Sequence, residues 1–203
     1  MVAAVALAGC GGGEDTEESA DLPEGCAAVE APAPKEVSVN RSSEPLTEPT
    51  TAVVTTSCGV FEIGLDVARA PKTTASFASL VEQGFYDGLA IPRVERGYVV
   101  QTGDPKGDLT GGPGYFVDEA PPQDLAYTRG TVAMAKTAAE PPGRSGSQFF
   151  VVTAADAGLS PDYALVGKVT KGFEVVERIE ELGGPEGRPT APVVVESITL
   201  KEG

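Results

Sequence analysis

The amino-acid sequence predicts a mainly β domain whose strands pair antiparallel, with two helices packed against them. Three observations support this fold class. Many short runs of β-branched and aromatic residues follow one another after residue 50, turns rich in glycine and proline separate these runs, and only two segments have helical periodicity. A parallel α/β sheet would need strands that alternate with helices. We therefore expect an antiparallel barrel or sandwich, and in a barrel the two helices would cap the open ends.

The predicted strands begin with a hairpin. Residues 51–56 and 60–65 are β-rich, and Ser57-Cys58-Gly59 supplies the turn between them. Further short strands are expected at residues 89–94, 98–102, 131–135, 148–152 and 165–169. A last β-branched run covers residues 193–200 and closes the chain.

Two helices interrupt this series of strands. The first covers residues 71–84, with proline at its start and glycine past its end. The second covers residues 173–182 and stops at Gly183-Gly184-Pro185. Each has an apolar stripe, formed by Phe77, Leu80 and Val81 in the first and by Phe173, Val176 and Ile179 in the second.

Composition excludes several classes of function. The chain has 203 residues, a net charge of −15, no histidine and three cysteines. Without histidine, Ser–His and Cys–His nucleophilic catalysis and a histidine general base are excluded, and three cysteines alone cannot form a zinc tetrad. The negative charge argues against nucleic acid as a partner. We expect no metal and no cofactor, and no apolar run reaches the roughly 20 residues of a membrane-spanning helix.

The first ten residues, MVAAVALAGC, have features of an export signal. A short apolar run ends in Leu7-Ala8-Gly9-Cys10, and three glycines follow. This form resembles a bacterial lipobox, which implies cleavage before Cys10 and lipidation of its sulfur. The run is short and lacks basic residues, so we expect the start of the signal to lie upstream. The alternative is a chance alanine-rich N-terminus with an unmodified cysteine.

Residues 11–48 are predicted to form a disordered acidic linker. Residues 1–48 contain ten acidic and two basic residues, so −8 of the net charge of −15 lies in this segment. Low hydrophobicity, like charge and scattered prolines describe a segment that cannot bury enough apolar surface to fold. We expect a tether between a membrane surface and one domain of residues 49–203. An acidic binding tail is the alternative.

Cys26 and Cys58 remain as a pair once Cys10 is lipidated. In an exported protein, an even number of cysteines suggests a disulfide, which would pin the linker to the domain. Two free thiols are the alternative, because sequence does not show whether the two α-carbons are close enough to be bridged.

Several blocks resemble the cyclophilin family and follow the family's order. The first are Gly84-Phe-Tyr-Asp-Gly-Leu-Ala-Ile-Pro-Arg-Val94 and Tyr98-Val-Val-Gln-Thr-Gly-Asp104, which are similar to GFYDGxxFHRV and FMxQGGD. The others are Gly111-Gly-Pro-Gly-Tyr115, Arg129-Gly-Thr-Val-Ala-Met-Ala135, Gly146-Ser-Gln-Phe-Phe-Val-Val-Thr153 and Tyr163-Ala-Leu-Val-Gly-Lys168. The resemblance covers about residues 50–203.

This resemblance implies a closed antiparallel eight-stranded β-barrel capped by two α-helices. It also implies peptidyl-prolyl cis/trans isomerase activity on proline-containing polypeptides, here unfolded or exported proteins. The catalytic residues that it implies are Arg93, which supplies the guanidinium, Gln101, which would orient it, and Phe150 of the proline pocket. The other substrate-binding residues that the resemblance implies are Tyr98, Val99, Ala135, Lys136, Gln148, Leu159 and Tyr163.

A site without histidine can catalyse this reaction. Rotation about an X–Pro bond must cross a resonance barrier of roughly 18–20 kcal/mol, but it needs no nucleophile and no proton abstraction. As the bond twists, the prolyl nitrogen regains its lone pair, and a guanidinium can then donate a hydrogen bond that exists only in the twisted state. Arginine suits this role because it stays charged and its planar fork is directional. A dry apolar pocket would strengthen the interaction.

Four positions depart from the family's pattern: Pro92 and Tyr163 stand where it has histidine, Lys136 where it has asparagine, and Gly158 where many members have tryptophan. With Lys136 in place of asparagine, the amide that binds the substrate backbone in the family is missing. With Gly158 in place of tryptophan, the resemblance implies weak binding of cyclosporin. Pro92, Lys136 and Tyr163 motivate the alternative of a proline-binding module or chaperone with weak or no catalysis. A third possibility is an envelope adaptor that recruits through its acidic tether. We expect a monomer, exported and anchored to the outer face of the cytoplasmic membrane.

Overall fold

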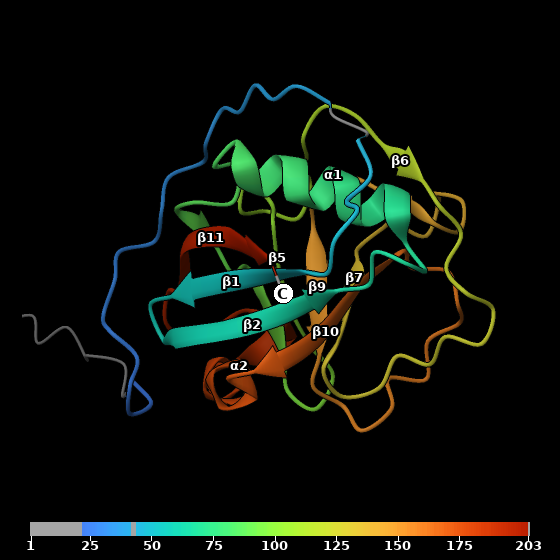
Figure 1. Cartoon of the computed structure of the whole chain (residues 1–203). Helices are drawn as coiled ribbons and strands as arrows, with labels where there is room; N and C mark the ends of the chain where they lie inside the picture. The colour runs from blue at the N-terminus through green and yellow to red at the C-terminus, as the bar shows by residue number, and fades with distance from the viewer. Residues whose placement is uncertain (1–21, 42–43, 203) are drawn as a thin grey trace, which may run out of the picture.

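The structure is a computed structural model that describes residues 22–41 and 44–202 (Figure 1). The predicted export signal with Cys10, and residues 11–21 of the predicted linker, lie outside the described residues. Lipidation of Cys10 therefore stays a prediction. Within the described residues, no helix combines the length and the apolar character needed to cross a membrane.

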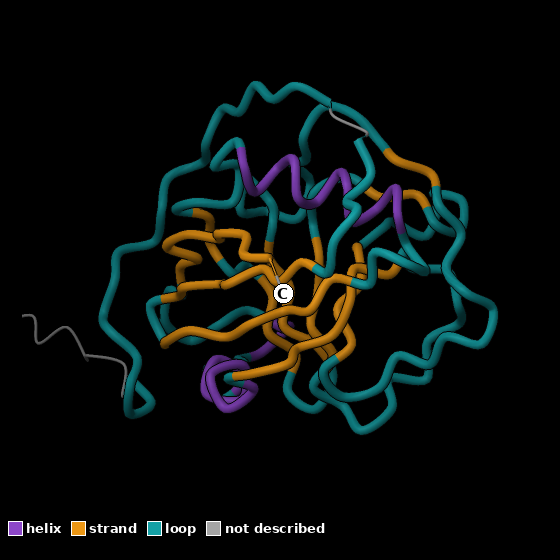
Figure 2. Tube along the Cα trace, in the orientation of Figure 1, coloured by secondary structure: helices purple, strands orange, loops and turns teal. Residues whose placement is uncertain are grey.

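Within the described residues, nine strands form one antiparallel sheet that curls around the core (Figures 1 and 2). In chain order the strands are β1 (Thr50–Thr56), β2 (Gly59–Leu65), β3 (Leu89–Ala90), β4 (Arg93–Glu95), β5 (Val99–Thr102), β7 (Thr131–Met134), β9 (Phe149–Val152), β10 (Leu165–Lys171) and β11 (Val194–Glu202). Their order across the sheet is β3-β11-β1-β2-β10-β7-β9-β5-β4. Two further strands, β6 (Val117–Asp118) and β8 (Arg144–Ser145), pair separately and were not predicted.

The prediction of a closed eight-stranded barrel is wrong, because the sheet is open. The run predicted as one strand divides at Ile91-Pro92 into β3 and β4, which pair with β11 and β5 respectively. Proline has no N–H to donate, so a strand cannot pair continuously through it. The result is a sheet with two edges, β3 and β4. The hydroxyl of Thr102, at the end of β5 beside the β4 edge, donates to the backbone oxygen of Ala90 in β3 at 2.8 Å.

Helices α1 (Pro71–Glu82) and α2 (Phe173–Glu180) lie at opposite ends of the curled sheet (Figure 1). Helix α1 starts with proline in its first turn, where the missing N–H costs no hydrogen bond. It buries Phe77 and Leu80 completely and contacts β10 and β11. Helix α2 turns Val176 and Ile179 inward and contacts β2, β4 and β5.

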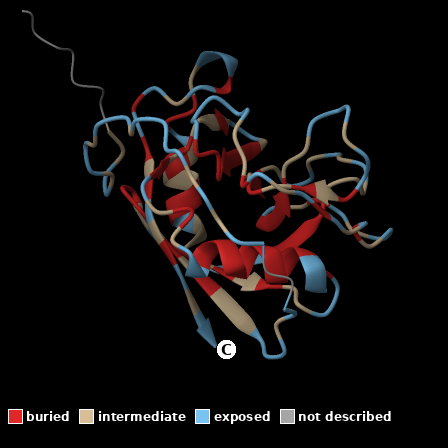
Figure 3. Ribbon diagram, turned by 90° about the horizontal axis from the view of Figure 1, so that it is seen from above, coloured by how far each residue is buried: buried red, intermediate tan, exposed pale blue. Residues whose placement is uncertain are grey.

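The interior contains two apolar clusters (Figure 3 shows the buried residues). The larger one lies inside the curled sheet and includes Phe149, whose ring meets Phe77 edge-on at 5.4 Å. The smaller one consists of Val99, Tyr127, Ala133, Phe150 and Val152. Neighbouring side chains on a strand point to opposite faces, so Phe149 and Phe150 enter different clusters. The smaller cluster lies beneath the functional site.

Residues 22–41, which we call the N-terminal strap, follow the surface of the domain from near α2 past α1 (Figure 1). They form no helix or strand. Backbone hydrogen bonds fix their path: Ala27 N donates to Ser57 O and Lys35 N donates to Pro105 O, both at 2.7 Å. The strap therefore has defined contacts with the domain, although it belongs to the segment predicted to be a disordered linker.

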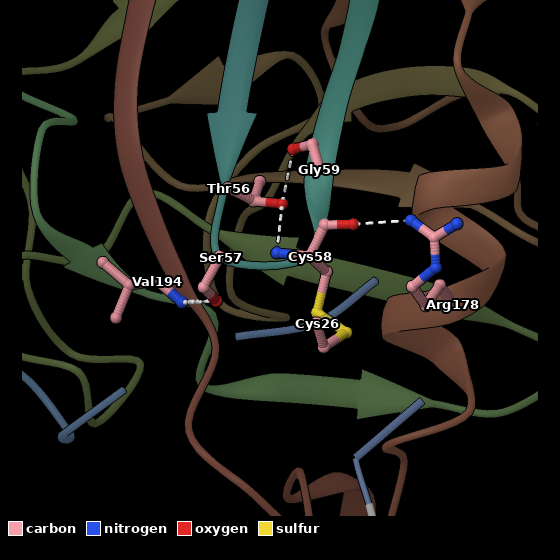
Figure 4. The surroundings of a disulfide bond; sticks show 7 residues. All are labelled: Cys26, Thr56, Ser57, Cys58, Gly59, Arg178 and Val194. Carbon is pink, nitrogen blue, oxygen red and sulfur yellow. Dashed lines mark hydrogen bonds between the residues drawn. A yellow bond between two sulfur atoms is a disulfide. The ribbon is translucent and has the colours of Figure 1, made fainter. Parts of the chain in front are cut away.

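A disulfide between Cys26 and Cys58 joins the strap to the turn between β1 and β2 (Figure 4). Arg178 of α2 lies beside it and donates from Nη1 to the backbone oxygen of Cys58 at 2.6 Å. Cys58 is buried. The bond attaches the strap to the core on the side of the domain where α2 lies.

Candidate active site

Arg93, Gln101 and Phe150 lie directly opposite one another on three neighbouring strands. Arg93 begins β4, the register pairs it with Gln101 of β5, and Gln101 pairs in turn with Phe150 of β9. Directly opposed residues of antiparallel strands point to the same face. The strand register thus brings together the three residues that the sequence predicts to be catalytic.

A groove with a volume of about 860 Å³ opens over this row of residues. Each predicted catalytic or substrate-binding residue lines it, namely Arg93, Tyr98, Val99, Gln101, Ala135, Lys136, Gln148, Phe150, Leu159 and Tyr163. They lie in β4, β5 and β9, directly before β5 and β9, directly after β7, and in the loop between β9 and β10. All of the predicted site residues therefore share one surface feature.

One part of the groove is an apolar pocket. Its floor is formed by Val99 and Phe150, which are only 2% and 4% exposed. Tyr163 forms a wall, with its ring edge-on to Phe150 at 5.5 Å between centroids. Leu159 and Tyr98 pack against the same cluster. Such a pocket favours a compact apolar ring and excludes water from its floor.

Tyr127 supports this pocket from below. It is completely buried, its hydroxyl donates to the backbone oxygen of Tyr163 at 2.6 Å, and it accepts from the backbone N–H of Tyr163 at 3.0 Å. Burial raises the pKa of Tyr127 to about 12, so the hydroxyl keeps its proton, and remains a donor, above the pH at which an ordinary tyrosine ionises. Sequence reasoning missed Tyr127 because its partner is remote in the chain.

A relay of hydrogen bonds fixes the guanidinium of Arg93. Its Nη1 donates to Gln101 Oε1 at 2.9 Å, Gln101 Nε2 donates to Gln148 Oε1 at 3.0 Å, and Gln148 Nε2 donates to Gly111 O at 2.9 Å. A backbone oxygen can only accept, so Gln148 must turn its N–H group toward Gly111. Each amide then has one orientation, and the oxygen of Gln101 must face Arg93.

The loop that ends this relay is organised by Asp104, which is 1% exposed. Its carboxylate accepts from the backbone N–H groups of Lys106 at 2.8 Å and Leu109 at 2.5 Å. Gly111 lies so close that a β-carbon there would meet Asp104 Oδ1 at 2.1 Å. Only glycine fits this position, and its backbone oxygen is thereby aimed at Gln148. Sequence reasoning did not assign a site role to this loop.

Glu95 is a further neighbour of Arg93 that sequence reasoning missed. Its Oε1 accepts from Arg93 Nε at 2.9 Å and from Arg93 Nη2 at 2.5 Å. The sequence could have indicated this neighbour, because Glu95 stands two residues after Arg93, directly after the predicted strand of residues 89–94, and residues two apart in a strand share a face. The guanidinium is therefore held from two sides, by a carboxylate and by the amide of Gln101.

Lys136 stands at the wall of the pocket. Its Nζ donates to the backbone oxygens of Thr137 at 3.2 Å and Glu140 at 3.1 Å. The amine also lies 5.5 Å from the centroid of the Tyr163 ring. These hydrogen bonds hold the lysine side chain against the loop that follows it. The site therefore has an ammonium group at this position, where the family pattern has an amide.

The curled antiparallel sheet and its groove define a β domain with an apolar pocket beside a fixed guanidinium. The family model for cyclophilin type peptidyl-prolyl cis-trans isomerase/CLD matches residues 51–200. The chain therefore belongs to the cyclophilin-type peptidyl-prolyl cis-trans isomerase family. The strap lies outside the matched residues.

Individual proteins show the same similarity. A probable peptidyl-prolyl cis-trans isomerase B of Mycobacterium leprae is 36% identical over 83% of this chain, and the chain spans 63% of that protein. Peptidyl-prolyl cis-trans isomerase A of Mycobacterium tuberculosis is 37% identical over 74% of this chain and 91% of its own length. A Cryptosporidium parvum cyclophilin type isomerase, solved in the presence of the dipeptide Ala-Pro, has a TM-score of 0.70, with 26% identity over 75% of this chain and 99% of that one.

Proposed function

We propose that this protein is a peptidyl-prolyl cis/trans isomerase that accelerates X–Pro isomerisation in polypeptides. The observation that carries the proposal is the position of Arg93. Its guanidinium is fixed at the edge of an apolar pocket, with Gln101 bonded to one of its nitrogens and Phe150 in the same row of the sheet. This is the arrangement that the reaction needs.

The pocket and the guanidinium have different roles in this mechanism. The pyrrolidine ring of the substrate would lie on Phe150 and Val99, and burial of the ring would hold the proline still while the preceding carbonyl group rotates. In the planar ground state the nitrogen lone pair is delocalised into the amide and accepts poorly. In the twisted state the lone pair is localised, and Arg93 can donate to it. The hydrogen bond therefore lowers the barrier without tightening binding of either isomer.

The relay of amides makes this donor pre-organised. Arg93 does not have to find its orientation during the reaction, because Gln101 and Gln148 already fix it. A pre-organised donor in a site that excludes water is worth about 10²–10³ in rate in other enzymes. No titrating group takes part, which fits a chain without histidine.

The test is a protease-coupled peptide assay of the purified protein and its Arg93→Ala variant. We expect kcat/KM to fall about 100-fold, in line with loss of one pre-organised donor. Arg129→Ala is the matched control, because Arg129 is also an arginine paired with a glutamate, Glu177, but lies away from the groove. Equal rates for the wild-type and Arg93→Ala proteins would refute the proposal.

A binding module with weak catalysis is the second candidate, and the carboxylate of Glu95 is the observation that favours it. This carboxylate lies against Arg93 and offsets part of its positive charge. A proline peptide titrated with the protein while its cis/trans exchange is followed by NMR distinguishes the two functions. Saturable binding with unchanged exchange would support the module, whereas accelerated exchange supports the isomerase.

We further propose that the protein acts on exported proteins at the outer face of the cytoplasmic membrane, held there by a lipid on Cys10. The lipobox-like Leu7-Ala8-Gly9-Cys10 and the acidic segment that follows support this proposal. Mass spectrometry of the protein from membranes of a cell that expresses it should find a lipid on Cys10. The Cys10→Ser variant should leave the membrane fraction, and a wild-type protein without lipid would contradict the proposal.

A further inference from the structure

The hydrogen bonds of Arg93 leave a defined part of its guanidinium free. The group has five N–H bonds, one on Nε and two on each terminal nitrogen. Glu95 accepts from Nε and from Nη2, and Gln101 accepts from Nη1. One N–H on each terminal nitrogen is therefore left, and no described residue accepts from either of them. These two N–H bonds are the ones available to a substrate.

The contact with Glu95 differs from an ordinary surface ion pair. Exposed pairs are worth little, because two long side chains must be ordered in water. Arg129 and Glu177 form such a pair, with side chains 48% and 45% exposed, whereas Arg93 and Glu95 are 29% and 39% exposed. Arg93 and Glu95 also belong to the same short strand, which fixes the spacing between their backbones.

Strand register reinforces the arrangement. Arg93 pairs with Gln101 and Glu95 pairs with Val99, so both acceptors and a residue of the pocket floor lie on one face of β4 and β5. Gln101 holds the guanidinium from the neighbouring strand and Glu95 holds it along its own strand. Acceptors on two sides restrict the plane of the group as well as its position.

We propose that Glu95 is a positioning residue for the isomerisation: it holds the Nε side of Arg93, so that the two terminal N–H groups left free by Gln101 and Glu95 face the prolyl nitrogen. The inference rests on the proposed isomerase function. Glu95 does not line the groove and would not touch the substrate, so its effect would appear in kcat more than in KM.

The two bonds from Arg93 end on a single oxygen, Oε1 of Glu95, and this makes a decisive variant available. Glutamine has one acceptor oxygen on a side chain of the same length, so Glu95→Gln can keep both bonds while it removes the charge. Glu95→Ala removes the acceptor altogether. Glu177→Ala is the matched control, because it breaks an arginine–glutamate pair outside the groove.

We expect Glu95→Ala to lower kcat by about fivefold to tenfold through loss of orientation, with KM changed less than about twofold. Glu95→Gln should restore most of the loss, and Glu177→Ala should keep the wild-type kcat. The inference is overturned if Glu95→Ala keeps the wild-type kcat, or if Glu95→Gln is as slow as Glu95→Ala.

A second readout does not depend on activity. NMR of the ¹⁵N-labelled protein can follow the Nε–H group of Arg93, whose signal is assigned by its absence from the spectrum of Arg93→Lys. The Nε proton should exchange slowly with water in the wild type and in Glu95→Gln. It should exchange fast in Glu95→Ala. If the wild type fails to catalyse, the proposed function fails while this signal still reports the bond. If the wild type catalyses and the signal is the same in all three proteins, the positioning role alone is wrong.

Discussion

Gln101 and Gln148 are joined by a hydrogen bond of 3.0 Å from Nε2 of Gln101 to Oε1 of Gln148. Gln101 lies in β5, and Gln148 directly precedes the adjacent strand β9. Each side chain donates from its amide nitrogen and accepts with its amide oxygen. Gln148 is thus linked to Arg93 without touching it. The relay of side chains therefore extends two residues beyond Arg93, the group that would donate to the prolyl nitrogen.

Loss of the Gln101 amide and loss of the Gln148 amide should therefore both slow catalysis, but to different degrees. Gln101→Ala removes an acceptor of Arg93, and we expect kcat to fall about tenfold, equivalent to about 1.4 kcal/mol of barrier. Gln148→Ala leaves Gln101 in place but frees its orientation, so the decrease should be smaller, about threefold. Steady-state kinetics on one proline peptide would measure both. A larger effect for Gln148→Ala than for Gln101→Ala would contradict the order of the relay.

Because of the disulfide, we expect reducing agents to lower the stability of the protein. Cys26 and Cys58 are 32 residues apart in the chain, and closing a loop of this length destabilises the unfolded state by about 3.7 kcal/mol. Reduction should therefore lower the melting temperature by roughly 7–15 °C. Calorimetry with and without a thiol reductant is the measurement. Cys26→Ala should melt at the lower temperature in both conditions, and a wild type that is insensitive to reductant would show that the two thiols are free.

Gly158 allows the expectation about cyclosporin to be tested. The residue is exposed, its φ is +63°, and nothing lies within 4 Å of the position of a β-carbon. Gly158→Trp therefore meets no steric obstacle but adopts a left-handed conformation at a cost of about 1–2 kcal/mol. We expect weak cyclosporin binding by the wild type and tighter binding by Gly158→Trp, measured by calorimetry. Gly158→Ala carries the same strain without an indole and should bind as weakly as the wild type; equal affinity of all three proteins would contradict the prediction.

Much of the fold could be predicted from local patterns. The hairpin of β1 and β2 is marked by β-rich runs around a short turn, and proline and glycine mark the limits of α1. The break between β3 and β4 was also readable, because Pro92 stands inside the predicted strand. Strands β6 and β8 could not be found in this way, because two residues are too few to show a period.

The site was predictable where its residues stand in sequence blocks that resemble a known family, and less so where residues act only through contacts with distant parts of the chain. Arg93, Gln101 and Phe150 stand in recognisable blocks, and strand register brings them into one row. Gly111 and Tyr127 act through contacts with residues far along the chain, which no local pattern reveals. The strap contacts depend on tertiary packing of a segment whose composition alone predicts a free linker.

Because Tyr127 is buried, we expect the protein to lose stability in alkaline solution. A tyrosine in an unfolded chain ionises near pH 10, whereas burial raises the pKa of Tyr127 to about 12 in the folded protein. Below pH 10 both states keep the proton, and the contribution of the buried hydroxyl is fully present. Between about pH 10 and 12 the unfolded state loses its proton while the folded state keeps it, so the free energy of unfolding falls as the pH rises.

Urea unfolding at several pH values between 9 and 12 would measure this slope. Tyr127→Phe should be less stable at neutral pH by about 1–2 kcal/mol, because the backbone N–H and oxygen of Tyr163 lose their partner. Its stability should also fall less steeply above pH 10. Burial raises the pKa of Tyr86 in the same direction, so part of the slope should remain in Tyr127→Phe and decrease further when Tyr86→Phe is added. If Tyr127→Phe had the same alkaline slope as the wild type, Tyr127 would titrate alike in the folded and unfolded chains, and its buried support of the pocket would have to be abandoned.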